Sequence, residues 1–408
     1  MKFGIMHQAL VSILPVIFLL PCTASGGFTE TLPKGTFLID ESYMISSLDS
    51  AYNNQGRKAP LLDPIERYEP GGGLQGIIIP KAKVKYGILV NQLHYGILDN
   101  LSIGIGVPVV LYTEVNPNLE WQPGDFQQNL GRPYSEKDFW EWAASMGQPK
   151  PQKWIGNKGV LADIQLGLRY RFTDGFTWFD KNGLAMSVLL TGALPTGRQP
   201  DPEEIVAAGT TSWDLHSNGD IGLHLSMDKF FKKSLDGRLI LGADVFYEFL
   251  LPHQYTSPEG EKNPLLLNYR PYVGKHYIID GGDFSGASFQ TDIVPYKGPT
   301  LSTWLTKHDM EKAKSLPPFL TLSFRYTFTY LQQTNWESNS EIWDWEREKL
   351  WRPGYKNILQ GQAVFSLLRI GAPIQPYFAY RNQTWIPGKN CRAADVLNFG
   401  VRLLIKAW

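Results

Sequence analysis

Strict alternation of apolar and polar residues constrains the fold of this chain more than any other feature of its sequence. From Leu320 to Tyr330 the chain reads LTLSFRYTFTY, so one face carries Leu, Phe and Tyr while the other carries Thr, Ser and Arg. Successive side chains of a β-strand point to opposite faces of the sheet, so this stretch predicts a strand with one apolar and one polar face. The same pattern recurs at residues 101–111, 162–172, 220–228, 239–249 and 398–406.

The length and aromatic content of these stretches favour strands that cross a lipid bilayer. A transmembrane strand needs about ten residues and carries aromatic residues near the ends of its apolar face. A large soluble β-sandwich also has alternating strands, but here the second face carries charged residues. We therefore expect an all-β fold, a transmembrane antiparallel β-barrel of about twelve strands. Eleven strands can be assigned directly, and an even total places one more within residues 262–300, with residues 288–296 as the suggested position.

The connections between these strands alternate between short and long, as expected for periplasmic turns and extracellular loops. Residues 96–100 and 371–375 are short connections. The long ones are residues 49–73, 116–158, 196–216, part of 252–290, and 333–357.

Two of the long loops are expected to carry short helices. Ser135-Glu136-Lys137-Asp138 has the spacing of a capping box, and Ser338-Asn339-Ser340-Glu341 opens a second helical stretch. The second stretch carries Trp343, Trp345 and Trp351. These indoles either pack the loop onto itself or form a surface that collects apolar solutes.

The first residues have the pattern of a secretory signal peptide. Lys2 precedes an apolar run over residues 9–20, and small residues follow it. The run is shorter than the roughly 20 residues of a membrane-spanning helix. We expect cleavage after Ala24, with residues 1–24 as the signal peptide and residues 25–408 as the barrel. The predicted location is the outer membrane of a Gram-negative bacterium.

Composition excludes several other classes of protein. The 39 basic residues balance the 39 acidic ones, so nothing indicates the basic surface that nucleic acid requires. The two cysteines, Cys22 and Cys391, cannot build a disulfide framework or a cysteine zinc site. The histidines show no spacing typical of metal ligands, and no glycine-rich phosphate loop is present. We therefore expect no metal and no cofactor.

Charged residues fall on the polar faces of the predicted strands and would point into the lumen. Facing acidic and basic walls would select solutes by charge and size. Alternatively, these residues pair across a plugged interior, because buried charges are costly unless they are paired. Twelve strands give an interior wider than that of an eight-stranded barrel and narrower than that of a general porin. The residues expected to line the pore are Asp163, Arg169, Arg171, Asp244, Glu248, Arg325 and Arg402.

One pair of residues suggests a catalytic alternative. His224 and Ser226 lie two residues apart on one face of a strand, a spacing shared with outer-membrane phospholipase. A serine becomes a nucleophile when a base lies beside it. The apolar face of this strand contains Leu223 and Leu225, however, so His224 and Ser226 are expected to face the lumen rather than lipid. A lipid hydrolase is therefore only the third hypothesis, and we expect that the protein is not an enzyme.

Three motifs follow one another in an order typical of a known family. They are YGILDNL at residues 95–101, ADIQLGLRYRF at residues 162–172 and ALPTG at residues 193–197. Together they resemble the outer-membrane family named for the meta-pathway of phenol degradation, over roughly residues 73–252. Ala162 and Arg198 depart from the Gly and Asp that the family usually has. In physical terms the motifs are structural: Asp99 and Asn100 suit a tight turn because both tolerate left-handed backbone angles.

The resemblance implies an outer-membrane barrel that passes or binds aromatic and other hydrophobic compounds. The first hypothesis is therefore a passive channel for small molecules of this kind, surrounded by outer-membrane lipid. The second is a plugged barrel with a structural or binding role, such as a docking partner for a periplasmic or surface complex. A continuous path through the lumen would distinguish the two.

Overall fold

A computed structural model describes residues 27–406, with the exception of residues 63, 70–71, 126–131, 146–149, 199–218, 232–234, 257–275, 281, 298–316, 334, 339–352 and 371. The predicted signal peptide and the predicted second loop helix with its tryptophans lie outside the described residues. No described helix is long and apolar enough to cross a membrane.

Twelve antiparallel strands form a closed barrel, which confirms the predicted fold class and strand number. Each strand pairs with the next one along the chain, and the pairing of the last strand with the first completes the ring. The strand expected near residues 288–296 is part of β16. The barrel strands are β1 (Thr36–Tyr52), β5 (Lys83–Leu98), β6 (Leu101–Asn116), β10 (Ile164–Arg171), β11 (Leu184–Leu194), β12 (Asp220–Phe230), β13 (Leu239–Leu250), β16 (Phe284–Tyr296), β17 (Leu320–Leu331), β19 (Gly354–Phe365), β20 (Ile374–Asn382) and β21 (Cys391–Lys406).

Side chains alternate across the barrel wall in the way the sequence predicts. On β12, Leu223 and Leu225 are 56% and 44% exposed, whereas His224 and Ser226 beside them are 3% and 1% exposed. The exposed apolar side chains form the outer surface and the buried polar ones face the lumen, because neighbours on a strand point to opposite faces.

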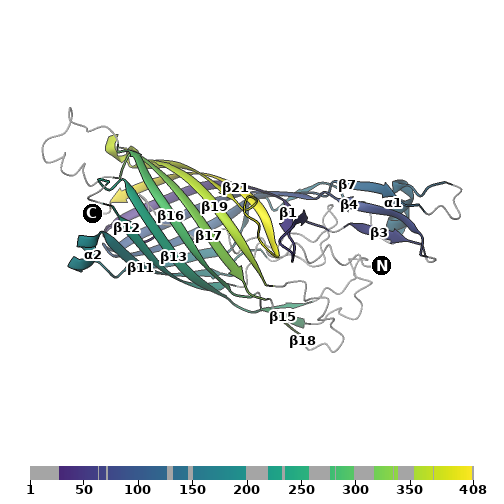
Figure 1. The fold of residues 1–408 in the computed structure, drawn as a ribbon, viewed down its shortest axis with the longest axis horizontal. Coiled ribbons are helices and arrows are strands. Elements are labelled where there is room, and N and C mark those ends of the chain that lie inside the picture. Colours follow the sequence, from purple (N-terminus) through teal and green to yellow (C-terminus); the bar gives the residue numbers. More distant parts are fainter. Residues whose placement is uncertain are drawn as a thin grey trace.

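The two ends of the barrel differ in size (Figure 1). We call the end that carries α2 (Thr177–Asn182) and the end of β21 the turn end. The direct β5–β6 turn and η2 (Leu367–Ile370) also lie at the turn end, since they connect strands there. At the opposite end a structured extension projects beyond the barrel, and we call this the arm end.

The arm is a small sheet covered by a helix, and it was not anticipated from the sequence as a folded unit. It consists of β3 (Ile65–Tyr68), β4 (Leu74–Pro80), β7 (Leu119–Pro123) and α1 (Glu136–Ser145). The remaining short strands are β2 (Lys58–Pro60), β8 (Trp154–Gly156), β9 (Val160–Leu161), β14 (His253–Thr256), β15 (His276–Asp280) and β18 (Asn335–Ser338).

Helix α1 begins where the capping box predicts. The Ser135 hydroxyl accepts a hydrogen bond from the backbone N–H of Asp138, and the Asp138 carboxylate accepts one from the N–H of Ser135 at 2.8 Å. Phe139 and Ala143 face inward from this helix and pack on Ile78 of β4. The reciprocal cap satisfies donors that a helix start leaves unpaired.

Two details of the connections differ from expectation. Strand β16 ends at Tyr296 and β17 begins only at Leu320, so these two strands are separated by more residues than a short turn contains. The β5–β6 turn also does not use left-handed backbone, because the described non-glycine residues with positive φ are Asn118, Asn157, Asp236 and Asn390. The acidic residue of that turn, Asp99, instead accepts a hydrogen bond from the backbone N–H of Lys34 at 2.9 Å.

Candidate functional site

The first described residues of the chain lie inside the barrel. Residues 27–35, which we call the N-terminal segment, precede β1 and cross the lumen near the turn end. Phe28, Thr29 and Leu32 of this segment are all buried. The barrel interior is therefore not an open tube at this level, since part of its cross-section is occupied by the protein's own backbone.

One end of the N-terminal segment is held by a single carboxylate on β12. Asp228 accepts hydrogen bonds from the backbone N–H of Phe28 at 3.0 Å and of Thr29 at 2.7 Å, and from the Thr29 hydroxyl at 2.7 Å. The chain approaches so closely that a Cβ on Gly27 would lie 2.6 Å from Asp228 Oδ2. Hydrogen bonds to a charged acceptor are the stronger kind, so Asp228 is the main attachment of this part of the segment.

The other end of the segment is held by the YGILDNL motif. The Thr31 hydroxyl donates to the Asp99 carbonyl at 2.7 Å, and the Leu32 N–H donates to the Ser102 hydroxyl at 2.8 Å. A Cβ on Gly96 would lie 2.1 Å from the carbonyl oxygen of Pro33. The glycine is thus required by the close approach of the segment. The motif that was predicted to form a turn therefore also binds the N-terminal segment.

Between these two attachments the segment contacts two of the predicted pore-lining arginines. The Arg325 guanidinium lies 4.5 Å from the centroid of the Phe28 ring and donates from Nε to Gln290 Oε1 at 2.8 Å. Arg169 lies near the Glu30 carbonyl, with 3.4 Å between Nη1 and O. Both side chains contact the N-terminal segment inside the barrel, and their pore-lining role stays a prediction.

Arg402 is part of a buried ion pair on the β21–β1 side of the lumen. Its Nε donates to Asp40 Oδ2 at 2.9 Å, and the Tyr377 hydroxyl donates to Asp40 Oδ1 at 2.8 Å. The guanidinium also lies 4.5 Å from the centroid of the Tyr377 ring. Each group has a partner of opposite charge or a hydrogen bond, which is the usual condition for burying charge.

Asp244 and Glu248 lie on β13 with His224 of β12 between them. Asp244 Oδ2 is 3.1 Å from His224 Nδ1, and Asp244 Oδ1 accepts from the Ser226 hydroxyl at 2.7 Å. Glu248 Oε1 is 3.9 Å from His224 Nε2. The Ser226 hydroxyl is thus bonded to a carboxylate and not to the imidazole, and it faces the lumen. This geometry does not place the imidazole of His224 as the base beside the serine, as the hydrolase hypothesis would require.

The two remaining predicted residues lie at strand ends. The Asp163 carboxylate accepts from the backbone N–H of Gly197 at 2.6 Å, which ties the second motif to the third at the arm end. Arg171, the last residue of β10, donates to Asp174 from Nε and Nη2 at 2.5 and 2.7 Å. Arg171 therefore binds an acidic residue of the turn that follows β10. The pore-lining role of the other residues stays a prediction.

The interior also has an apolar wall, which the sequence analysis missed. It is formed by buried side chains of β1, β5, β6 and β21, on which Trp154 and Val160 pack. The wall lies across the ring from β12 and β13, because β21 and β1 are each six places from these strands in a ring of twelve. Its members on these strands are Met44, Leu48, Val84, Tyr86, Ile88, Val90, Val110, Val115, Ala394 and Val396, and Ala162 joins them. The β12–β13 side of the lumen is therefore acidic, with Asp244 and Glu248, whereas the apolar wall shares its side with the Arg402–Asp40 ion pair.

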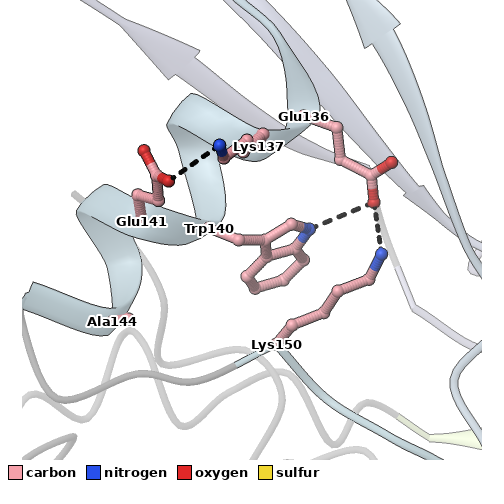
Figure 2. Close-up of a pocket in the computed structure, with 6 residues that line it drawn as sticks. All are labelled: Glu136, Lys137, Trp140, Glu141, Ala144 and Lys150. Atoms are coloured by element: carbon pink, nitrogen blue, oxygen red, sulfur yellow. Dashed lines mark hydrogen bonds and ion pairs between the residues drawn. The ribbon is translucent and has the colours of Figure 1, made fainter.

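A shallow pocket of about 450 Å³ lies on the arm, outside the lumen. Figure 2 shows the ring of Trp140 between two ion pairs, Lys150 with Glu136 and Lys137 with Glu141. The hydrogen bond from Lys150 lowers the pKa of Glu136 below its usual value.

A further charge pair supports the start of α1. Hydrogen bonds from Arg132 and Ser135 hold the pKa of Asp138 well below its usual value. Within the described residues no cluster of His, Cys, Asp and Glu is arranged to hold a metal ion.

Comparison with known proteins defines the class of fold. The chain is similar to the crystal structure of an outer-membrane channel from Pseudomonas putida F1, with a TM-score of 0.52 over 94% of this chain and 100% of that chain, at 11% identity. At this identity the likeness concerns the fold alone, that of an outer-membrane β-barrel.

Weaker similarity extends to two toluene transporters. TodX of Pseudomonas putida aligns over 94% of this chain and 92% of its own, at 10% identity and a TM-score of 0.33. TbuX of Ralstonia pickettii aligns over 92% and 90%, at 9% identity and a TM-score of 0.33. Scores this low carry no argument about the present chain. No protein-family model matches the sequence, and no curated protein is detectably similar to it.

Proposed function

We propose that the protein is a passive outer-membrane channel for small hydrophobic or aromatic molecules, related to the family named for the meta-pathway of phenol degradation. The observation that carries the proposal is the apolar wall inside a closed transmembrane barrel. An apolar solute gains free energy by leaving water for such a surface, at about 25 cal/mol per Å² of buried area. A general porin has no need of such a wall, because its solutes are polar and its channel is filled with water.

The remaining assignments complete this proposal. Residues 1–24 are removed as a signal peptide, and the barrel is inserted in the outer membrane of a Gram-negative bacterium. The turn end then faces the periplasm and the arm faces the outside, as the short turns and long loops of such barrels do. Solutes enter beside the arm, pass along the apolar wall and meet the N-terminal segment last.

The second candidate is a plugged barrel that serves as a binding or docking protein for a periplasmic or surface partner. Two observations favour it: the N-terminal segment crosses the lumen, and the arm carries an aromatic pocket with charged rims. No observation favours the hydrolase, since Ser226 is bonded to Asp244.

Solute uptake into proteoliposomes tests the first candidate against the second. The mature protein is expected to speed the entry of toluene and benzyl alcohol, and to conduct ions in discrete steps in a planar bilayer. Ile88→Asn, which introduces an amide on the apolar wall, should slow toluene uptake several-fold, while Ile88→Leu should not, because it keeps the wall apolar. A folded barrel that passes neither solute nor ions would favour the binding role.

A further inference from the structure

His224 is a buried imidazole whose ring is fixed on one edge and free on the other. Its Nδ1 lies 3.1 Å from Asp244, and its ring stacks on Phe246 at a centroid distance of 5.3 Å. The side chain is 3% exposed, yet Nε2 has no hydrogen-bond partner. A buried polar atom without a partner costs free energy, so its persistence calls for an explanation.

The free edge of this imidazole faces a carboxylate. Glu248 Oε1 is 3.9 Å from His224 Nε2, too far for a direct hydrogen bond. A single atom can nevertheless lie within about 2.8 Å of both, the usual length of a charge-assisted bond. Gly222 leaves room for the Glu248 side chain, because a Cβ there would lie 2.2 Å from Thr191 Oγ1 and 3.1 Å from Glu248 Cγ. The two polar atoms therefore define one position in the lumen, on the acidic side opposite the apolar wall.

A ligand group at the position between His224 Nε2 and Glu248 must donate hydrogen bonds. In the neutral imidazole whose ring proton lies on Nδ1 toward Asp244, Nε2 keeps a lone pair. Glu248 offers carboxylate oxygens, and Asp220 and Asp244 act on the same carboxylate as further negative charges. Lys356 acts on Glu248 from β19, but the described residues contain no ion pair between the two. An anion is repelled here, whereas a group with several N–H donors and a positive charge satisfies both acceptors.

We propose that His224 Nε2 and Glu248 form a lumenal subsite for a primary ammonium group. Carried on a small aromatic molecule, this group would bind the acidic side while the ring reaches toward the apolar side. The inference rests on the proposed function for the route by which such a molecule arrives. It narrows the solutes to those that include protonated arylalkylamines.

Calorimetric titration of the full-length mature protein in detergent tests the subsite without requiring transport. Benzylammonium is the ligand, and benzyl alcohol and benzoate are the comparison compounds of similar size. We expect benzylammonium to bind more tightly than either. Glu248→Gln should weaken binding at least about tenfold, because a hydrogen bond to a charged group is lost. His224→Gln should also weaken it, since the amide cannot place an acceptor at the same point.

Asp292→Asn provides the matched control. Asp292 is a buried, lumen-facing carboxylate on β16 whose neighbour is Gln290, away from His224. This variant should bind benzylammonium as the unaltered protein does, and all variants are checked for heat-modifiable migration of a folded barrel. Equal affinity for benzylammonium and benzyl alcohol, or an unchanged affinity in Glu248→Gln, would overturn the subsite.

Uptake of benzyl alcohol into proteoliposomes is measured on the same preparations. If the unaltered protein takes up benzyl alcohol but does not bind benzylammonium, the subsite is rejected and the channel is left standing. Ammonium binding without uptake of either compound would support the subsite and reject the channel.

Discussion

Thr29 and Asp228, which are 199 residues apart in the sequence, are joined inside the barrel by two hydrogen bonds of 2.7 Å each. Both end on the same carboxylate oxygen, and the Phe28 N–H occupies the other at 3.0 Å. Hydrogen bonds to charged groups contribute roughly 1.5–3 kcal/mol each in protein interiors. The attachment of Phe28 and Thr29 therefore depends on one side chain of the barrel wall.

Replacing that side chain should release the segment and open the turn end. In Asp228→Ala the three donors lose their acceptor, and we expect the single-channel conductance in a planar bilayer to rise several-fold. Asp163→Asn is the control, because Asp163 is also a buried carboxylate but bonds Gly197 at the opposite end. An unchanged conductance in folded Asp228→Ala would mean that the segment does not limit the pore.

The seat of the segment on β5 gives an independent prediction. In Gly96→Ala the new Cβ would lie 2.1 Å from the Pro33 carbonyl, which is backbone and cannot yield by rotating a side chain. The N-terminal segment must therefore move away from β5. We expect a protease added from the turn end to cleave its peptide bonds faster. Gly361→Ala serves as control, since a Cβ there meets nothing within 4 Å. Equal cleavage rates in the two variants would contradict the proposed seat.

The sequence predicts the barrel because its signal is local. Alternation along a strand such as β17 depends only on which face meets lipid, so it can be read without knowing any partner. The start of α1 is equally local, since Ser135 and Asp138 cap each other three residues apart. These features need no information about the rest of the fold.

The lumen could not be predicted in the same way. Thr29 and Asp228 are hydrogen-bonded, but nothing in the sequence around either residue indicates the other. The alternating pattern places Asp228 on the lumenal face and does not distinguish it from other residues of that face. The apolar wall was also not predicted, because Val110 lies on the face of residues 101–111 that was expected to be polar. Arg171 matched the pore pattern and yet pairs with Asp174, since a strand's last residue faces a turn rather than the opposite wall.

The buried ion pair of Arg402 with Asp40 predicts a large loss of stability when it is broken on one side. In Arg402→Met, the Asp40 carboxylate still accepts the hydrogen bond from the Tyr377 hydroxyl but loses its ion pair with the guanidinium. We expect the free energy of unfolding to fall by about 3–5 kcal/mol, the usual cost of an uncompensated buried charge. The measurement is urea unfolding in lipid vesicles followed by gel mobility. The double variant Arg402→Met with Asp40→Asn should recover much of the loss.

An exposed ion pair provides the comparison for the loss of stability expected in Arg402→Met. Lys81 and Glu120 form an ion pair whose side chains are 61% and 47% exposed. Lys81→Met should therefore cost less than about 1 kcal/mol, because water screens the pair. Similar losses in Arg402→Met and Lys81→Met would show that the lumenal pair contributes no more than a surface one.

The arm should loosen in acid before the barrel does. Hydrogen bonds from Arg132 and Ser135 lower the pKa of Asp138, and the hydrogen bond from Lys150 lowers that of Glu136. A carboxyl group whose pKa is lower in the folded state stabilises that state at pH values above its unfolded pKa, about 4. This contribution is lost as the pH falls below that value toward the folded pKa. Hydrogen exchange of the α1 amides should therefore show protection that is constant from pH 7 to about 5 and falls below about 4. In Asp138→Asn the protection should be lower at neutral pH and should change less with acid, while amides of β12 serve as the internal reference. If α1 and β12 lost protection together, the arm would not respond to these two carboxylates on its own.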